Sequence, residues 1–203
     1  MPYTAEHKEE TRRRIISSAR RLFNRHGFTG VSIDQIMAAA GLTRGGFYNH
    51  FRTKDELYAE AVGQVLSCDM SQDWEGYELD LAAPPALLAR QVIAAYVSDR
   101  HFSDVEASCP LMAVPSDVAR GGTLVKEAYG KLLEAMVNLF EASQGQDMEA
   151  RARAVRMAVL CIGGMVLSRA VGETAFGAEI REVARQAAFE AGGWDSEMPA
   201  AAE

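Results

Sequence analysis

The close spacing of helix start and stop signals in the first 66 residues most constrains what this chain can fold into. Apolar residues recur three and four positions apart over residues 8–26, as in an amphipathic helix, and Gly27 follows where a left-handed cap is preferred. Capping boxes, which pair a hydroxyl with a Gln or Glu three residues later, open further helices at Ser32 and Thr53. We expect four short helices, over residues 8–26, 32–40, 43–51 and 53–66, with Thr43 capping the third.

The rest of the chain also reads at helical period, and no alternating pattern favours strands. Residues 69–83 lose this period, and two prolines at 84 and 85 restart it, since proline suits the first helical turn. We therefore expect an all-α fold with an N-terminal helix-turn-helix domain, residues 1–66, and a second helical domain, residues 67–203. The helices expected in the second domain cover residues 85–99, 110–119, 123–143, 147–171 and 178–191.

Charge is distributed unevenly along the chain. Residues 1–54 hold ten Lys or Arg against four Asp or Glu, a net charge of +6, whereas the whole chain carries -7. A basic segment on an acidic body indicates that the first part meets a polyanion such as DNA. Charge alone is explained equally well by a solvated charged helix, so both interpretations stay open at this point.

Several classes of protein are disfavoured. The longest uninterrupted apolar run, residues 157–167, has eleven residues, fewer than the ~20 of a membrane span. The first residues lack the apolar stretch of a secretory signal, so we expect a cytoplasmic, nucleoid-associated protein without a membrane partner. The three cysteines are far apart and the four histidines do not converge with acids, so we expect no disulfide framework, no metal and no cofactor.

Residues 43–51 carry the chemistry that favours DNA binding. Their two consecutive glycines, at 45 and 46, each cost about 1 kcal/mol relative to alanine in a helix. Close approach to a major groove about 12 Å wide would explain that cost. Arg44 can pair with guanine, whereas Tyr48, His50 and Lys54 are expected on phosphates. The residues predicted to contact DNA are Ser32, Thr43, Arg44, Gly45, Gly46, Tyr48, Asn49, His50 and Lys54.

Residues 27–36, the turn at residues 40–43 and the Phe-Tyr-x-His-Phe-x-x-Lys-x-x-Leu run of residues 47–57 resemble the N-terminal domain of the TetR family of bacterial transcriptional regulators. Val31 and Met37 depart from that pattern, which commonly has a hydroxyl residue and an alanine there. The resemblance implies a homodimer that reads a palindromic double-stranded DNA operator through two recognition helices. It also implies a C-terminal domain that binds a small-molecule inducer and forms the dimer.

The helix expected over residues 147–171 is apolar around almost its whole circumference, so it must be buried on several sides. Gly163 and Gly164 permit a close crossing with the last helix. Two copies of this helix pair would form a four-helix interface, as in proteins of the similar family, so we expect the homodimer to form through the last two helices. The alternative is a core helix of a monomer.

An inducer pocket is expected among the helices between Trp74 and Phe140, where aromatic and thioether side chains suit an apolar or planar ligand. Ordinary core packing explains each of these side chains as well. Cys109 precedes Pro110 at a helix start, where amide dipoles would lower a thiol pKa, so oxidant or electrophile sensing is an alternative to an inert buried thiol. The candidate ligand-binding residues are Tyr96, Phe102, Cys109, Met112, Met136 and Phe140.

The resemblance implies a ligand-responsive repressor, and we expect no enzymatic activity. A small helical enzyme with Cys109 as nucleophile and His101 as base is a rival interpretation, and so is an architectural DNA-binding protein without a ligand. No glycine-rich phosphate loop or serine nucleophile elbow is written in the sequence.

Overall fold

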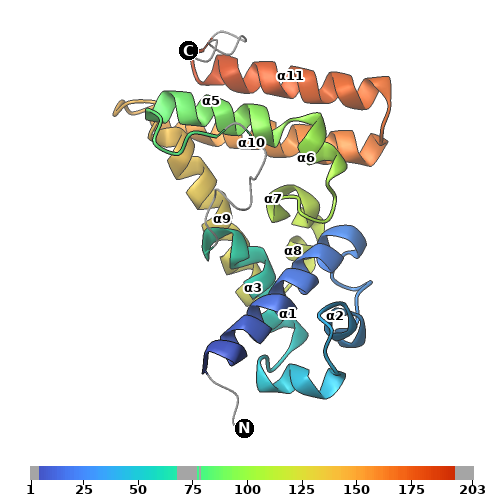
Figure 1. Cartoon of the computed structure of the whole chain (residues 1–203). Coiled ribbons are helices and arrows are strands. Elements are labelled where there is room, and N and C mark those ends of the chain that lie inside the picture. The colour runs from blue at the N-terminus through green and yellow to red at the C-terminus, as the bar shows by residue number, and fades with distance from the viewer. Residues whose placement is uncertain (1–4, 68–76, 78, 195–203) are drawn as a thin grey trace. The chain divides into compact units, whose positions relative to one another are not determined.

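The computed structural model of the chain describes residues 5–67, 77 and 79–194, and every regular element in these ranges is a helix (Figure 1). The all-α expectation is therefore confirmed. The elements are α1 (Ala5–His26), α2 (Ile33–Ala39), the 3-10 helix η1 (Arg44–Asn49), α3 (Lys54–Ser67), α5 (Pro85–Tyr96), α6 (Asp99–Ser103), α7 (Pro110–Ala113), α8 (Pro115–Arg120), α9 (Thr123–Glu141), α10 (Ala150–Val171) and α11 (Ala175–Ala191).

The chain divides into two compact units. Unit 1 combines residues 1–68 with residues 105–132, and unit 2 combines residues 69–104 with residues 133–203. The domain predicted over residues 1–66 thus lies in unit 1 together with α7, α8 and the first part of α9. Its boundary as a separate functional domain stays a prediction.

The core of unit 1 forms around aromatic side chains of α1 and α3. Phe23 is buried beside Tyr58, with ring centroids 4.9 Å apart in an edge-on arrangement. Phe28 stacks on Tyr58 at 4.7 Å. Val118 of α8 and Val125 of α9 are buried in the same cluster. Burial of these two valines explains why unit 1 extends beyond the first four helices.

Polar contacts also tie residues 105–118 to the end of α1. The Asn24 side-chain amide donates to the carbonyl oxygens of Glu106, at 3.0 Å, and Ser108, at 2.8 Å. The backbone amide of Phe28 donates to Asp117 Oδ2 at 3.0 Å. Gly27 has a φ of 72°, and a Cβ at this position would lie 2.7 Å from the same carboxylate oxygen. Gly27, which was predicted to cap α1, therefore also lets the Asp117 carboxylate approach the backbone closely.

Two predicted helices are each split in the structure. Residues 110–119 form α7 and α8, because Pro115 begins a new helix and cannot continue the hydrogen-bond ladder of the preceding one. Residues 85–99 end as α5 at Tyr96, and α6 begins after Ser98, whose hydroxyl accepts from the amide of His101 at 3.1 Å. Local capping thus overrode the continuous apolar period.

Unit 2 is built on the antiparallel pair α10 and α11. Met157, Cys161 and Met165 of α10 are fully buried. The two helices cross so closely that a Cβ on Gly164 would lie 2.3 Å from the Cβ of Ala184. One of the two predicted small residues is therefore required by packing within the chain.

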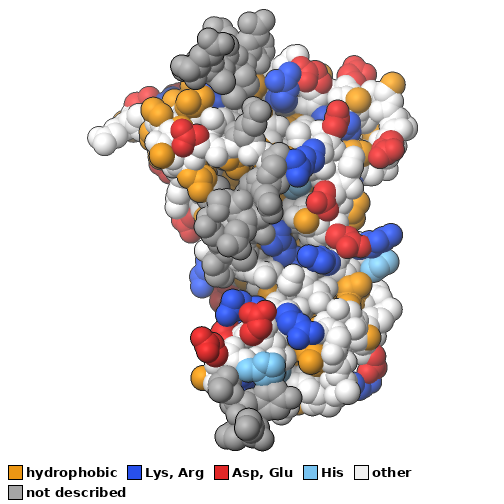
Figure 2. Space-filling view, viewed as in Figure 1, with side chains coloured by type: hydrophobic (Ala, Val, Ile, Leu, Met, Phe, Trp, Pro, Cys, Tyr) orange, Lys and Arg blue, Asp and Glu red, His pale blue; other side chains and the backbone are white. Residues whose placement is uncertain are grey.

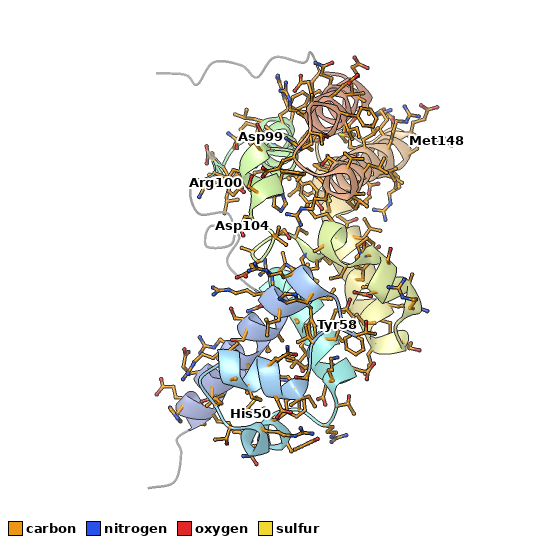
Figure 3. All side chains as sticks on the ribbon, turned by 90° about the vertical axis from the view of Figure 1, so that its right-hand side faces the viewer. His50, Tyr58, Asp99, Arg100, Asp104 and Met148 are labelled. Carbon is orange, nitrogen blue, oxygen red and sulfur yellow. The ribbon has the colours of Figure 1, made fainter. Side chains whose placement is uncertain are left out.

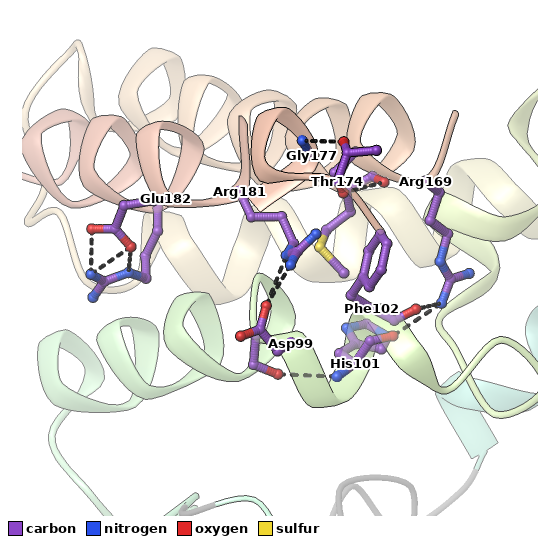
Figure 4. Close-up of polar contacts among 12 residues, drawn as sticks. Asp99, His101, Phe102, Arg169, Thr174, Gly177, Arg181 and Glu182 are labelled. Atoms are coloured by element: carbon purple, nitrogen blue, oxygen red, sulfur yellow. Dashed lines mark hydrogen bonds and ion pairs between the residues drawn. The ribbon is translucent and has the colours of Figure 1, made fainter. Parts of the chain in front are cut away.

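Arginines of α10 and α11 hold α6 in unit 2 (Figure 4). Arg181 donates to Asp99 Oδ1, at 2.5 Å from Nη2, and its guanidinium lies 4.0 Å from the centroid of the Phe102 ring. Arg169 Nη2 donates to the carbonyl oxygens of His101 and Phe102, both at 3.0 Å. Arg169 thus supplies hydrogen-bond donors to carbonyl oxygens at the end of α6, which have no partner within the helix itself.

Helix α10 is long and apolar enough to cross a membrane by length and composition alone, with a mean hydropathy of 1.7 over its most apolar window. The sequence expectation counted only the uninterrupted apolar run, whereas α10 continues past arginines at both ends. In this structure 39% of that window is buried, and a core helix of a soluble protein passes the same test. The feature is therefore weak evidence for a membrane span.

The substitution Gly164→Ala tests the close crossing of α10 and α11. Because the added methyl would lie 2.3 Å from the Cβ of Ala184, we expect a loss of about 1–3 kcal/mol in the free energy of unfolding. Urea denaturation followed by circular dichroism measures it. Gly130→Ala in α9 is the matched control, since no described atom lies within 4 Å of its added Cβ. That control should gain about 0.5–1 kcal/mol, and equal stability of the two variants would contradict the crossing.

Candidate nucleic-acid interface

The turn between α2 and η1 is fixed from both sides. The predicted capping box at the start of α2 is present: the Ser32 hydroxyl accepts from the Gln35 amide at 3.2 Å, and the Gln35 side chain accepts from the Ser32 amide at 2.7 Å. Gly41 has a φ of 69°. Arg14 of α1 donates to the carbonyl oxygen of Ala40 at 2.5 Å. An arginine of the basic first helix therefore stabilises the turn.

The helix predicted over residues 43–51 is shorter and tighter than expected. It is a 3-10 helix over residues 44–49, and Thr43 occupies the capping position without a side-chain hydrogen bond. Two glycines weaken the preference for an α-helix here, and its six residues make it a long 3-10 helix, because runs of more than three or four residues are uncommon. The expected Thr43 side-chain cap is thus wrong, although the element itself exists.

At the start of α3 only part of the predicted capping box forms. The Thr53 hydroxyl accepts from the Glu56 amide at 3.1 Å, as predicted. The Glu56 carboxylate accepts from the amide of Arg52 at 2.7 Å, one residue before the predicted partner.

Side chains of η1 divide into a buried and an exposed set. Phe47 and Phe51 are almost fully buried, with ring centroids 5.7 Å apart. Tyr48 is 62% exposed, and its ring is nearly perpendicular to that of Phe47, with centroids 5.2 Å apart. The exposed set on this element is Thr43, Arg44, Gly45, Tyr48 and Asn49. All five of these exposed residues are among those predicted to contact DNA.

The two consecutive glycines of η1 have open or tolerant surroundings. No described atom lies within 4 Å of a Cβ added at Gly45. At Gly46 the nearest atom is Cε of the buried Met37, at 3.5 Å, which is ordinary contact. Both glycines have negative φ. Packing within the chain therefore leaves the absence of a side chain at Gly45 unexplained.

Arg44 and Lys54 have partners within the unit. Arg44 Nη1 forms an ion pair with Asp34 Oδ2 at 2.6 Å. Lys54 Nζ donates to the carbonyl oxygen of Phe28 at 2.5 Å and lies 4.2 Å from the centroid of that ring. Burial lowers the pKa of Lys54. Lys54 thus supports the turn after α1, and its predicted role on phosphate stays a prediction.

His50 lies beside a cleft of about 480 Å³ between α1 and η1 (Figure 3). Its Nδ1 is buried without a hydrogen-bond partner among the described residues. Burial lowers the pKa of His50, and the charges of Lys8 and Arg12 lower it further. The α1 side of this cleft is formed by His7, Lys8 and Thr11. The sequence analysis did not name these residues, although the positive charge of residues 1–54 pointed to this part of the chain.

Most of the arginines that make α1 basic are paired within unit 1. Arg12 forms an ion pair with Glu60, and its guanidinium lies 4.7 Å from the centroid of the Phe51 ring. Arg25 pairs with Glu106 at 2.6 Å. In the view of Figure 2 Lys and Arg side chains stand beside Asp and Glu side chains. Part of the positive charge thus stabilises the fold, as the interpretation without DNA allows.

The residues predicted to bind an inducer are divided between the two units. Tyr96, Phe102 and Phe140 are buried and Met136 is half-buried in unit 2, whereas Cys109 and Met112 are buried in unit 1. That they line one pocket stays a prediction, and Trp74, the first limit of that region, lies outside the described residues.

Cys161 and His101 are buried in unit 2. Cys161 is fully buried, which raises its pKa to about 12. His101 shares a hydrogen bond between Nδ1 and the Tyr96 carbonyl oxygen at 2.8 Å. Within the described ranges no cluster of three or more His, Cys, Asp or Glu could hold a metal ion.

Unit 2 has an apolar groove of about 400 Å³ along α10 and α11. Val159 of α10 is 62% exposed and Leu167 is 59% exposed. Phe176 and Val183 of α11 are 59% and 58% exposed on the same groove. Gly163 lines it too, with no described atom within 4 Å of an added Cβ.

Comparison with known proteins finds a family match in the region of the candidate interface. Residues 15–61 match the model of "Bacterial regulatory proteins, tetR family". The HTH-type transcriptional regulator AcrR of Shigella flexneri is 30% identical over 90 residues, which are 44% of this chain and 41% of that relative. The HTH-type transcriptional regulator SrpR of Pseudomonas putida is 46% identical over 54 residues, 27% of this chain and 25% of that relative. The matches thus span less than half the length of these curated relatives, which are named as regulators, not as enzymes.

Solved structures resemble the chain over most of its length. The reduced form of NemR from E. coli has a TM-score of 0.69 and 17% identity, and the likeness covers 94% of this chain and 99% of that one. A TetR transcriptional regulator from Chloroflexus aurantiacus has a TM-score of 0.64 and 20% identity, covering 91% and 96%. At these identities the likeness concerns the fold.

The lowered pKa of His50 predicts a pH dependence of stability. Because folding lowers this pKa below 6.5, the unfolded chain binds more protons than the folded chain between the two values. The contribution of neutral His50 is therefore present above pH 6.5 and is lost as the pH falls through the folded-state pKa.

We expect His50→Gln to show a smaller fall in urea midpoint than the wild type between about pH 7.5 and about pH 5.5. His26→Gln is the control, because His26 lies at the exposed end of α1. An equal fall in all three proteins would contradict the partly buried, neutral His50.

Proposed function

From the TetR-family N-terminal domain that this chain carries in residues 15–61, we propose that the protein is a DNA-binding transcriptional repressor that a small-molecule inducer releases from a palindromic operator. It works in the cytoplasm, on the nucleoid. The observation that carries the proposal is the exposed polar face of η1 over two buried phenylalanines. Such a face, held rigidly against a core, fits the role of a recognition element in the major groove.

The glycine at position 45 supports this role. Alanine would fit there without a clash in the free protein. A residue without a side chain is therefore better explained by a bound partner than by folding, and duplex DNA is a partner that requires close backbone approach. Ser32, Thr43, Tyr48, Asn49, His50 and Lys54 are proposed to add contacts to phosphates and base edges.

The apolar groove along α10 and α11 supports a homodimer through these helices. A contiguous exposed apolar patch marks an interaction surface, and a second copy would cover it with the same residues about a two-fold axis. Such a dimer would present two recognition elements to two half-sites, spaced by about one helical turn, ~34 Å, or a small multiple.

The inducer is proposed to be an apolar or planar molecule that contacts Tyr96, Phe102, Met136 and Phe140 in unit 2. A ligand can shift the DNA-binding equilibrium only if it binds the incompetent form more tightly. Thiol-based sensing through Cys109 is the alternative, because Cys109 is the N-cap residue of α7, directly before Pro110. The low exposure of Cys109, 9%, favours an unreactive thiol.

Selection from random duplex DNA tests the proposal, followed by a screen for compounds that release the selected site. Recovery of an inverted repeat supports a dimeric regulator. The proposal is contradicted if no duplex is enriched in the selection, or if the enriched duplexes contain only single sites without symmetry. Binding of an inverted repeat that no compound and no oxidant weakens would favour the architectural alternative.

The substitution Gly45→Ala separates binding from folding. We expect the free energy of unfolding to stay equal or rise by up to about 1 kcal/mol, because alanine favours the helix and meets open space. Affinity for the selected site should fall on the order of tenfold, or ~1.4 kcal/mol. Fluorescence anisotropy measures the affinity, and Gly130→Ala is the control that should leave it unchanged. Wild-type affinity in Gly45→Ala would contradict backbone contact with DNA.

The substitution Leu167→Glu tests the dimer surface. A carboxylate placed inside an apolar interface loses its hydration without gaining a partner, so we expect monomers at concentrations where the wild type is dimeric. Sedimentation equilibrium measures the change. Leu124→Glu is the matched control, since Leu124 belongs to unit 1, is 56% exposed and is not among the residues that line the groove. A dimeric Leu167→Glu protein would place the interface elsewhere.

A further inference from the structure

Asp34 is an unexpected residue on a surface proposed to meet DNA. It is the only acidic residue between Gly27 and Lys54 in the sequence. A carboxylate there repels phosphate, so it lowers affinity for every duplex regardless of sequence. Its presence therefore needs a benefit other than affinity.

The geometry joins Asp34 to the residue predicted to read a base. Asp34 Oδ2 lies 2.6 Å from Arg44 Nη1, and the two side chains are 55% and 61% exposed. An exposed ion pair contributes only about 0–1 kcal/mol to folding. Stability alone thus gives little reason for the pair.

Both partners start from well-fixed backbone positions. Asp34 is the second residue of α2 and lies within the capping box that Ser32 and Gln35 form. Arg44 is the first residue of η1, after the turn that Arg14 holds. The carboxylate is therefore a fixed point against which the long arginine side chain is oriented.

The hydrogen-bonding capacity of the guanidinium makes this orientation useful. A guanidinium has five N–H donors in one plane. Asp34 engages Nη1, which leaves the edge formed by Nε and Nη2 for another planar acceptor pair. The O6 and N7 atoms of guanine form such a pair in the major groove. A side chain already held in one plane also loses less conformational entropy on binding.

We propose that Asp34 is a positioning residue that presents Arg44 to one guanine in each half-site and so sets base preference at that position. The inference rests on the proposed DNA-binding function. It gives Asp34 two opposite effects: it increases discrimination at one base pair and decreases affinity for all duplexes through its charge.

Selection and binding measurements on the full-length protein test these two effects. For Asp34→Ala we expect preference for guanine at one position per half-site to fall about tenfold, whereas affinity for an unrelated duplex stays equal or rises. Asp34→Asn keeps an oxygen that can accept from Nη1, so its base preference should lie between wild type and Asp34→Ala. In an Arg44→Ala background, Asp34→Ala should leave the base profile unchanged.

Asp55→Ala is the matched control. Asp55 is also the second residue of its helix, α3, and is exposed in the same unit. Asp55→Ala removes the same charge as Asp34→Ala and should leave the base profile as in the wild type. Circular dichroism spectra check that all variants fold.

The outcomes separate the inference from the function on which it rests. If the wild type selects no inverted repeat, the proposed function fails and the inference fails with it. If the wild type selects one and Asp34→Ala has the same base profile, only the inference is overturned. It is also overturned if Asp34→Ala changes the profile in the Arg44→Ala background, or if Asp55→Ala has the same effect.

Discussion

Burial of Phe47 and Phe51 is the interaction on which the candidate interface depends. Phe47 lies in a short 3-10 helix that includes two glycines and has little intrinsic stability, and Phe51 lies two residues after the end of that helix. Tertiary packing therefore holds η1 in place, and the buried rings fix the position of its exposed face. The cation of Arg12 over the Phe51 ring and the bond from Arg14 to the turn extend this support to α1.

The same packing explains how the basic first segment divides its tasks. The arginines of α1 make this helix basic, as expected of a segment that meets a polyanion. Several of them also donate hydrogen bonds to backbone carbonyl oxygens or form ion pairs with carboxylates within the unit. Arg44 and Tyr48, by contrast, remain more than half exposed on the polar face. Charge counting along a sequence cannot separate these two uses, because both need the same residue type.

Local signals made much of the fold predictable. The Ser32 capping box, the Gly27 and Gly41 breaks and the buried face of residues 47 and 51 follow from spacing within a few residues. Contacts between distant residues were not predictable in this way. The bonds from Asn24 to residues 106 and 108, and the Lys54 contact with the Phe28 carbonyl, depend on the tertiary arrangement. The pairing of Arg44 with Asp34 likewise crosses a turn whose geometry the sequence left open.

The contribution of residues 105–132 to unit 1 has a consequence for transplanting this interface into other proteins. Val118 and Val125 complete the core around Tyr58, and Asp117 accepts from the backbone after α1. A chimaera joined at residue 66 would replace these partners with those of a foreign body. Such a chimaera would keep the polar face but lose the side chains that pack against the first helix. Exchange of a functional interface between such proteins therefore requires transfer of residues 105–132 as well as the N-terminal segment.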